Sequence, residues 1–245
     1  MKSIVISQPM FFPWTGMFEQ IRLCDVFVHY DDVQFSKGSF FNRVQIKTAN
    51  GTSWLTVPLK EMSLGQSINE SMIDHSSNWQ RKHLEMLRQS YARAPFKREM
   101  LEIVEAVYGV GHKDLAQFSA DSIETVCKYY GLDQGREFQW SSRLNIPGES
   151  TDRVLAIVKH FGGDTYVTGH GARRYFGHEL AESMNISVEY IDYRKTPYPQ
   201  LHGEFTPYVS ILDLIANVGR DGSKYLHSTT LPWRTFLQNE QASAA

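Results

Sequence analysis

The pattern of apolar and polar residues near the start of the chain predicts a strand, a helix and a second strand. Residues 3–7 are rich in β-branched side chains and end at a proline-containing turn, as buried strands often do. Residues 14–24 have apolar side chains at helical spacing after Pro13, and residues 25–30 form another apolar run. Such a unit normally places its two strands side by side and parallel, joined by a right-handed crossover.

The following segment predicts a hairpin and then a change to helices. Residues 43–48 alternate between polar and apolar side chains, and residues 53–57 continue after Asn50-Gly51, which is typical of a type I′ turn. From there the apolar spacing becomes helical. Three helices are expected within a helical insertion at about residues 76–131, namely residues 78–90, 96–108 and 114–130.

After residue 131 the strand and helix patterns alternate again. Strands are expected at residues 137–141, 165–168 and 187–193, helices at 152–161 and 172–184, and a last helix from Ser210. Together these elements predict one Rossmann-like α/β domain over residues 1–240, with a parallel sheet, an inserted helical subdomain and a β-hairpin. Residues 241–245 are expected to form a disordered tail.

Polar side chains gather where two strands of this predicted sheet end. In open parallel sheets, ligands bind beyond the carboxyl ends of the strands, where the strand order reverses. Gly169 and His170 follow one strand and precede a helix. The segment after the second strand carries polar residues among aromatic ones, namely Asp31, Asp32, Gln34, Lys37, Asn42, Arg43 and Lys47. We therefore expect both segments to border one binding site.

Asp31 and Asp32 are the candidate acidic groups. Neighbouring side chains on a strand point to opposite faces, so only one of the two is expected to enter the site directly if the strand continues this far. One carboxylate would then position Arg43 or Lys37, and the other would bind a substrate amine or a metal; a solvated pair at a strand end is the alternative. A cation beside a carboxylate lowers its pKa, which favours charge pairing over general-acid catalysis.

Arg43 and Lys47 are the candidate anion-binding groups. Four residues apart on an extended strand, they are expected on one face of the hairpin, where two cations suit a phosphate or a carboxylate. A solvated hairpin face is the alternative. The turn after the first strand is expected to present Gln8 and Trp14 to a ligand, or simply to pack as a tight aromatic turn.

The histidines differ in how well they are placed. His83 lies in a predicted helix, where a structural role is the more usual one. His170 lies among glycines before a helix that carries Arg173 and Arg174, so an anion could be held at that helix N-terminus. The glycine spacing matches neither a Walker loop nor a dinucleotide fingerprint. The sequence contains no HExxH, CxxC or His-x-His spacing, and we therefore expect no metal site.

Composition narrows the class of protein. Two cysteines in apolar helical patterns are typical of a reducing compartment, so we expect a cytoplasmic protein. No apolar run approaches the ~20 residues that cross a bilayer, so membrane insertion is not expected. A net charge of −2 argues against a dedicated nucleic-acid binder. An aromatic content of 13%, with many of these rings near polar residues, favours a protein that binds a small molecule.

Six segments in order along the chain point to one family. They are QPMFFPW, DVFVHYDDVQFSKGSFFNRVQIKTANGTSWLTVP, NWQRKHLEML, YARAPF, DTYVTGHGARRYF and YPQLHGEFTPYVSILDLIANVG. This set covers almost the whole chain and resembles the WbqC-like family, whose members are typically encoded in bacterial gene clusters for O-antigen and related surface polysaccharides. The resemblance implies an enzyme that attaches glycine or another acyl group to the amine of a nucleotide-linked deoxyamino sugar.

The resemblance also implies roles for particular residues. Asp32 or His83, with Asp31 beside them, would take the proton from the sugar amine. Motif positions of the family fall on Gln8, Asp31, Asp32, Gln34, Asn42, Arg43, His83, Gln200, Ser210 and Asp213, whereas His170 matches its motif less well. Arg43 and Lys47 would hold the diphosphate, and the aromatic side chains of Trp14, Phe41 and Trp54 would stack on the sugar or base. The acyl donor stays open between an acyl-adenylate made with ATP, an acyl carrier, coenzyme A and an aminoacyl-tRNA.

A second resemblance concerns the start of the chain. The strand, proline-rich turn, helix and second strand are similar to the opening of HIGH-type nucleotidyltransferases and pantoate–β-alanine ligases, which use ATP. Gly16 is followed by Met17 where those enzymes have their signature histidine. Two alternatives to the acyl transferase therefore remain, a non-catalytic nucleotide-sugar binding protein and an ATP-dependent, nucleotidyltransferase-like enzyme acting on a small metabolite.

Overall fold

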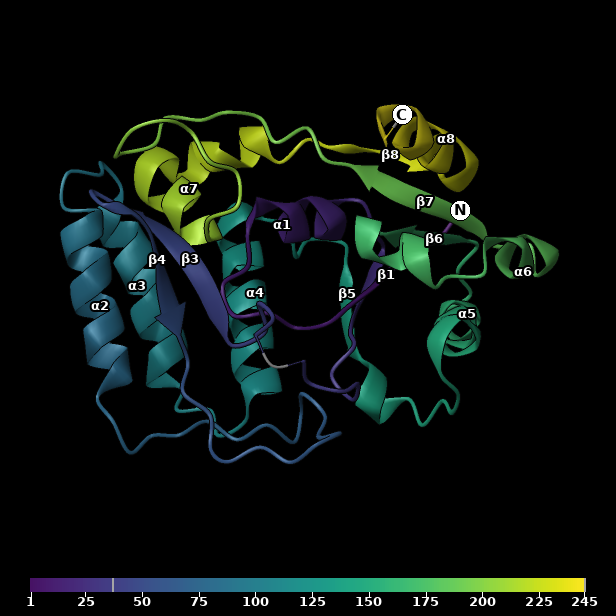
Figure 1. Cartoon of the computed structure of the whole chain (residues 1–245), viewed down its shortest axis with the longest axis horizontal. Coiled ribbons are helices and arrows are strands. Elements are labelled where there is room, and N and C mark those ends of the chain that lie inside the picture. The colour runs from purple at the N-terminus through teal and green to yellow at the C-terminus, as the bar shows by residue number, and fades with distance from the viewer. Residues whose placement is uncertain (37, 245) are drawn as a thin grey trace.

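The structure is a computed structural model that describes residues 1–36 and 38–244. Figure 1 shows a sheet on one side of the molecule and a β-hairpin with several helices on the other. The sheet has six strands in the order β5-β2-β1-β6-β7-β8. These are β1 (Ser3–Ser7), β2 (Val26–His29), β5 (Glu137–Trp140), β6 (Thr165–Thr168), β7 (Ser187–Asp192) and β8 (Thr229–Pro232). All neighbouring pairs are parallel except β7 and β8, which confirms the predicted α/β fold with a mostly parallel sheet.

The strand order reverses at β1. On one side β1 pairs with β2, with Ser7 opposite His29, and on the other side it pairs with β6, with Val5 opposite Val167. The chain therefore moves outward from β1 in both directions. The carboxyl ends of β1 and β6 form the switch point at which open α/β sheets bind ligands.

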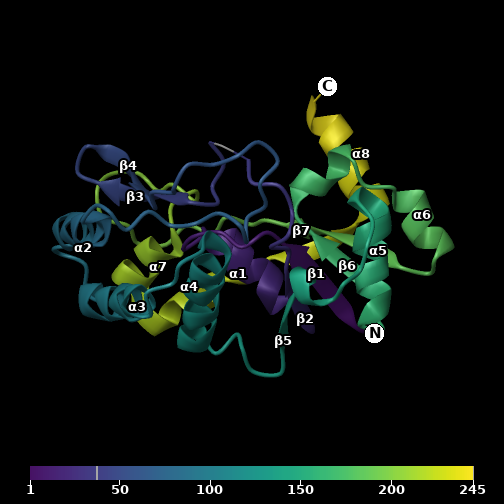
Figure 2. The same ribbon diagram turned by 90° about the horizontal axis from the view of Figure 1, so that it is seen from below.

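Helices cover both faces of the sheet, because successive side chains of each strand alternate between two hydrophobic cores. Ile4 and Val26 enter the core on one face, and Val5 and Phe27 enter the core on the other. The first core is closed by α5 (Ser150–His160), α6 (His178–Ser183) and α8 (Trp233–Ala244). The second is closed by α1 (Thr15–Arg22), α3 (Lys97–Gly109), α4 (Leu115–Tyr130) and α7 (Ile211–Val218). Figure 2 shows these two groups of helices on opposite sides of the strands.

The predicted helical insertion contains α2 (Trp79–Ser90), α3 and α4. Helix α4 begins after Asp114, whose carboxylate accepts a hydrogen bond from the Gln117 amide at 2.9 Å, and it ends at Gly131 in the left-handed conformation. His29 of β2 contacts Glu124 of α4 at 3.0 Å, so this helix packs directly on the sheet. None of the helices in the described residues is long and apolar enough to cross a membrane.

The hairpin of β3 (Arg43–Thr48) and β4 (Gly51–Thr56) is separate from the sheet, as predicted. Its turn differs from the prediction. A type I′ turn at Asn50-Gly51 needs a positive φ at both residues, yet Asn50 has none. Gly51, with φ of 104°, is instead paired with Thr48, so the turn is centred one residue earlier.

Two segments near the C-terminus also differ from the predictions. The helix expected at residues 172–184 is divided into a short 3-10 helix (His170–Arg174) and α6, because Gly177 is held outside the helix by the Thr151 hydroxyl. Strand β8 and helix α8 were not predicted. Trp233 and Phe236 bury one face of α8 in the sheet core. Further 3-10 helices in the described part of the chain are Ser141–Arg143 and Gly219–Tyr225.

Candidate functional site

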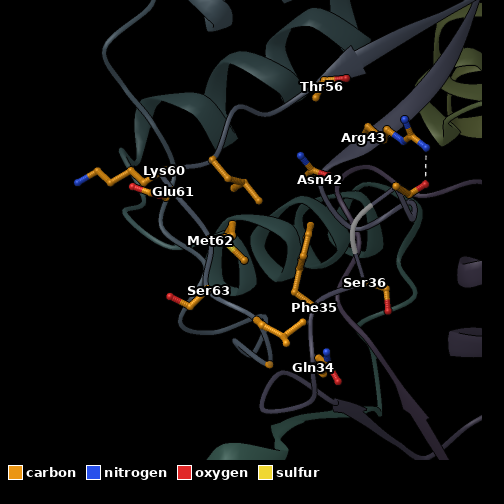
Figure 3. Close-up of a pocket in the computed structure, with 14 residues that line it drawn as sticks. Gln34, Phe35, Ser36, Asn42, Arg43, Thr56, Lys60, Glu61, Met62 and Ser63 are labelled. Atoms are coloured by element: carbon orange, nitrogen blue, oxygen red, sulfur yellow. Dashed lines mark hydrogen bonds between the residues drawn. The ribbon is translucent and has the colours of Figure 1, made fainter.

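Of the cavities next to the segments that follow β1, β2 and β4, two share Arg43 in their lining. The larger one, which we call the polar cleft, has a volume of about 980 Å³ and is drawn in Figure 3. Sites for drug-sized ligands have volumes of ~300–1,000 Å³, so the cleft suits a small molecule. It is lined by Gln34, Phe35, Ser36, Gly38, Asn42, Arg43, Thr56, Leu59, Lys60, Glu61, Met62, Ser63, Leu64 and Gly65.

Backbone pairing holds the two walls of the polar cleft together. The segment after β2 pairs with a later segment through Phe35 N to Gln66 O (2.9 Å) and Ile68 N to Val33 O (3.0 Å). At the other end, Asn42 exchanges hydrogen bonds with the Val57 backbone, including one from its own side-chain amide at 2.9 Å. The Asn42 side chain therefore shapes the cleft as well as lining it.

Arg43 has a guanidinium without a carboxylate partner among the described residues. Its Nε donates to the Ser39 carbonyl at 3.3 Å, and its Nη2 donates to the Gly38 carbonyl. Its central carbon lies 4.4 Å from the centre of the Trp54 ring. A planar cation that is held in place but carries no counter-charge is suited to bind phosphate or carboxylate.

The smaller cavity, which we call the aromatic pocket, has a volume of about 250 Å³. It is lined by Met10, Phe11, Pro13, Trp14, Phe40, Arg43, Val44 and Tyr208. Arg43 therefore lines both cavities, and the turn after β1 contributes Trp14 to the aromatic pocket. Phe41, which is expected to stack on the ligand, lines neither cavity, because it is only 6% exposed and packs on Phe35.

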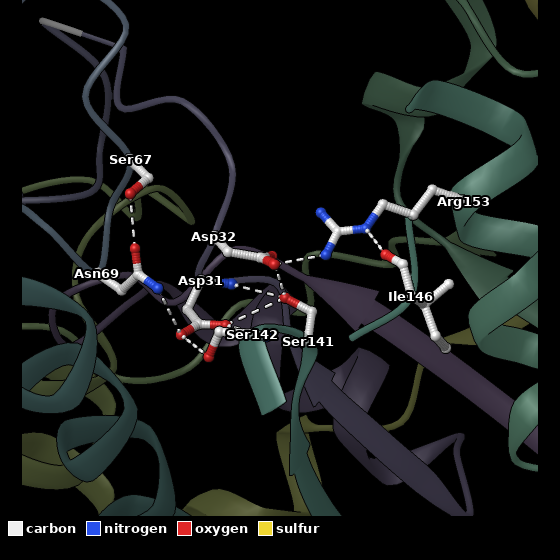
Figure 4. A network of polar contacts seen from close by, with 8 residues as sticks. All are labelled: Asp31, Asp32, Ser67, Asn69, Ser141, Ser142, Ile146 and Arg153. Carbon is white, nitrogen blue, oxygen red and sulfur yellow. Dashed lines mark hydrogen bonds and ion pairs between the residues drawn. The ribbon is translucent and has the colours of Figure 1, made fainter. Parts of the chain in front are cut away.

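Asp31 and Asp32 lie in a cluster at the ends of β2 and β5 (Figure 4). We call it the sheet-edge network, and it consists of Asp31, Asp32, Asn69, Ser141, Ser142 and Arg153. Asp31 accepts hydrogen bonds from the Ser142 amide (3.0 Å) and hydroxyl (2.7 Å). Asp32 accepts from Arg153 and lies 2.5 Å from the Ser141 hydroxyl, which is also 3.1 Å from Asp31.

The two carboxylates are not divided between opposite faces, because the strand does not continue to them. Strand β2 ends at His29, so Asp31 and Asp32 are beyond the pleat and both reach Ser141. The cation beside Asp32 is Arg153 of α5 rather than Arg43. Lys37, the other cation expected there, lies outside the described residues.

The pairing with Arg153 determines the protonation of Asp32. Burial by itself would raise the pKa of this carboxyl, but hydrogen bonds from Arg153 and Ser141 and the Arg153 charge outweigh it. The pKa of Asp32 is therefore below its ordinary value. A carboxylate in this state is ionised at neutral pH and is a weak base, which is the charge pairing that the sequence indicated.

His83 is buried behind the polar cleft rather than in its lining. Its Nδ1 lies 2.9 Å from the Tyr108 hydroxyl, and its ring packs on Trp79. Burial lowers the pKa of His83 to about 4, opposed by a backbone contact with Thr56, which does line the cleft. The imidazole is therefore neutral at pH 7.

Lys47 lines neither cavity. It belongs to a second cluster, which we call the hairpin network, made of Lys47, Tyr91, Tyr198, Gln200 and Asp213. The Lys47 ammonium donates to Gln200 Oε1 at 3.1 Å and to carbonyls of the 203–204 loop, and Tyr91 donates to Asp213 at 2.9 Å. Burial raises the pKa of Asp213. Lys47 and Asp213 are 4% and 0% exposed, so these two residues, together with Gln200, join elements of the fold.

The switch point itself holds Gln8, Gly169 and His170. His170 Nε2 contacts the Ile191 carbonyl at 2.8 Å, and its ring lies 5.0 Å from that of Tyr193. A Cβ at position 169 would lie 3.1 Å from the Tyr193 hydroxyl, so Gly169 allows this close packing. Gln8 follows β1, and its side-chain amide has no hydrogen-bond partner in the described part of the chain.

Sequence reasoning missed two groups of residues. Ser141, Ser142 and Arg153 could have been expected near Asp31, because β5 was predicted to join the same parallel sheet and its carboxyl end lies at the same edge. Glu61 carries no such signal, since only the pairing of distant backbone segments brings it to the cleft. Within residues 1–36 and 38–244, no group of three or more His, Cys, Asp or Glu side chains is placed to hold a metal ion.

Comparisons with known proteins agree with the resemblance seen in the sequence. A model of the WbqC-like protein family matches residues 8–225, which include both cavities and both networks. The chain is also similar to a protein of Mycobacterium tuberculosis described as "Uncharacterized protein Rv1507c". The two are 32% identical over 229 residues, which cover 92% of this chain and 98% of the mycobacterial protein. No solved structure matches.

Proposed function

This chain belongs to the WbqC-like protein family, and on that premise we propose that it forms an amide on the amine of a nucleotide-linked amino sugar. The observation that carries the proposal is Arg43, an uncompensated guanidinium at the junction of a polar cleft and an aromatic pocket. A nucleotide sugar has the matching sequence of groups, a polar sugar, an anionic diphosphate and an aromatic base. The diphosphate binds at Arg43 in this arrangement.

The lining of the polar cleft suits an amino sugar. Hydroxyl and amide side chains such as Ser36, Ser63 and Gln34 can bond sugar hydroxyls. Glu61 is the only acidic side chain among the described residues that line the cleft, and Figure 3 shows it on the side opposite Arg43. A carboxylate here pairs with the sugar ammonium and then takes its proton.

The reaction is nucleophilic acyl transfer. The neutral amine attacks the carbonyl carbon of an activated acyl donor, the donor's leaving group departs with the electron pair, and the amine proton goes to a base. We assign the base to Glu61 rather than to Asp32 or His83, because Asp32 is paired with Arg153 and His83 lies behind Thr56. The sheet-edge network then supports the cleft wall through Asn69 and Asp31.

Calorimetric titration with UDP- and dTDP-linked amino sugars tests the binding step. Arg43→Ala should weaken binding by about tenfold or more, because a hydrogen bond to a charged group contributes ~1.5–3 kcal/mol. Arg98→Ala is the matched control, since Arg98 is exposed on α3 and pairs only with Glu102. Equal affinity of wild type and Arg43→Ala would contradict the proposal.

A second candidate is a nucleotide-sugar binding protein without catalysis, favoured by the absence of both expected bases, Asp32 and His83, from the cleft lining. Product assays with radiolabelled acyl-adenylate, acyl-thioester and aminoacyl-tRNA donors separate the two. Glu61→Gln should keep nucleotide-sugar binding and abolish the amide product if the chain is an enzyme. A wild-type protein that binds the sugar but makes no product with any of these donors supports the binding protein.

A further inference from the structure

We infer that the aromatic pocket holds the base of the nucleotide sugar by stacking alone, so the protein selects its ligand by the sugar and not by the base. The inference rests on the proposed function, because it assigns a part of the same ligand to the second cavity. Its physical basis is the lining of that cavity and its position relative to Arg43.

The aromatic pocket has a buried floor and exposed aromatic walls. Phe11 and Val44 in the floor are 0% and 4% exposed, whereas Phe40 and Tyr208 in the walls are 56% and 54% exposed. The Tyr208 ring lies 5.8 Å from the ring of Trp14, and Phe40 lies 5.7 Å from Trp54. Large aromatic side chains left in water around a hollow are typical of a surface that a flat ligand covers.

The pocket offers few polar side-chain atoms that could read the edge of a base, and the Trp14 indole provides a single donor. Recognition of a particular base uses amide, carboxylate or guanidinium groups paired with its donors and acceptors. Among the described residues, the lining includes no amide or carboxylate side chain, and the Arg43 guanidinium is taken up by the diphosphate in the proposed arrangement. The Tyr208 hydroxyl is engaged by Lys195 at 2.7 Å. Stacking without such contacts tolerates any base, because every base has an aromatic face.

The position of Arg43 fixes the order of the ligand's parts. The pocket of about 250 Å³ takes a ring system but is too small for a whole nucleotide sugar, whereas the polar cleft is about 980 Å³. Arg43 lines both cavities, so a diphosphate at Arg43 has the base on one side and the sugar on the other. The base therefore lies on Trp14 and Tyr208, and the amine extends toward Glu61.

Competition binding with UDP, dTDP, ADP and GDP tests the inference. We expect the four dissociation constants to agree within about fivefold, since only stacking strength differs. Tyr208→Ala and Phe40→Ala should weaken all four by a similar factor of about five or more and leave inorganic pyrophosphate binding unchanged. Tyr208→Phe keeps the ring, removes only the contact with Lys195 and should bind like wild type. Both positions are exposed, and thermal unfolding checks that each variant folds.

Two results would overturn the inference. One is a preference of a hundredfold or more for a single base at constant phosphate charge. The other is unchanged nucleotide affinity in Tyr208→Ala and Phe40→Ala. Failure of the proposed function looks different, because then nucleoside diphosphates bind as described while amino-sugar nucleotides gain no affinity over them and yield no amide.

Discussion

The sheet-edge network and the hairpin network use the same kinds of groups for different ends. Each brings a cation and a carboxylate together from distant parts of the sequence. In the sheet-edge network, the side chains of Arg153 and Asp32 are 11% and 25% exposed, and they lie where two parallel strands end. In the hairpin network, Lys47 and Asp213 are almost completely buried, and among the described residues neither network lines either cavity. Charged groups that folding brings together thus either stay partly exposed at the edge of the sheet or become enclosed in the core, and burial separates the two networks.

The largest effect is expected at Lys47. Lys47→Met leaves Gln200 Oε1 and the carbonyls of Gly203 and Glu204 without their charged donor and removes a positive charge near Asp213. A hydrogen bond to a charged group contributes ~1.5–3 kcal/mol, so the loss of several should lower the unfolding free energy by about 3 kcal/mol or more. Urea unfolding measures this. Lys82→Met is the matched control, because Lys82 is exposed on α2. If Lys47→Met were as stable as Lys82→Met, the hairpin network would not stabilise the fold as proposed.

The next largest effect is a dependence of stability on pH, which is expected because His83 is buried like the hairpin network. Its pKa in the folded protein is about 4 against 6.5 ordinarily, so the folded state resists protonation while the unfolded chain accepts it. Stability is therefore complete above about pH 6.5 and falls as the pH is lowered toward 4. Between about pH 7.5 and pH 5, wild type should lose about 2 kcal/mol more than His83→Leu. His160→Leu is the control at an exposed position of α5, and its unfolding free energy should change with pH as in wild type. If the unfolding free energies of wild type and His83→Leu changed in parallel with pH, His83 would be in contact with solvent.

A smaller effect is expected for the pair of Asp32 and Arg153. A double-mutant cycle of Asp32→Asn and Arg153→Gln should give a coupling of about 1–2 kcal/mol, as for a partly buried charge-assisted hydrogen bond. The pKa of Asp32 is lowered in the fold, so this stability is present above the ordinary value of 3.8 and is lost as the pH falls below it. Additive single variants at neutral pH would show that the two groups do not interact in solution.

The smallest effect concerns Ser142. Ser142→Ala removes the hydroxyl that donates to Asp31 at 2.7 Å, while the Ser142 amide and Asn69 continue to donate. A loss of about 0.5–1 kcal/mol is expected, with nucleotide-sugar affinity reduced less than in Arg43→Ala. Chemical unfolding and calorimetry on the same variant measure both quantities. A loss equal to that of Lys47→Met would show that the sheet-edge network is as structural as the hairpin network.

Local patterns in the sequence were sufficient for most of the elements and for part of the site. Residues 3–7 and 165–168 are strands as predicted, and Arg43 and Trp14 do line cavities. The helix predicted at 172–184 failed because Gly177 is held by Thr151, a contact across 26 residues that no window contains. Likewise, the spacing of Arg43 and Lys47 placed both on one strand but did not show that the loop at 203–204 covers Lys47.

By itself, the sequence determined the periodic elements, the parallel order of the first strands and the family, because these depend on neighbours within a few residues or on motifs read in order. Only the tertiary structure decided which charges are free. Arg43 and Lys47 have similar surroundings in the sequence, yet one is left without a counter-charge and the other is enclosed by acceptors. The physical reason is that a charge is either paired or solvated, and its partners come from segments that lie close only after folding.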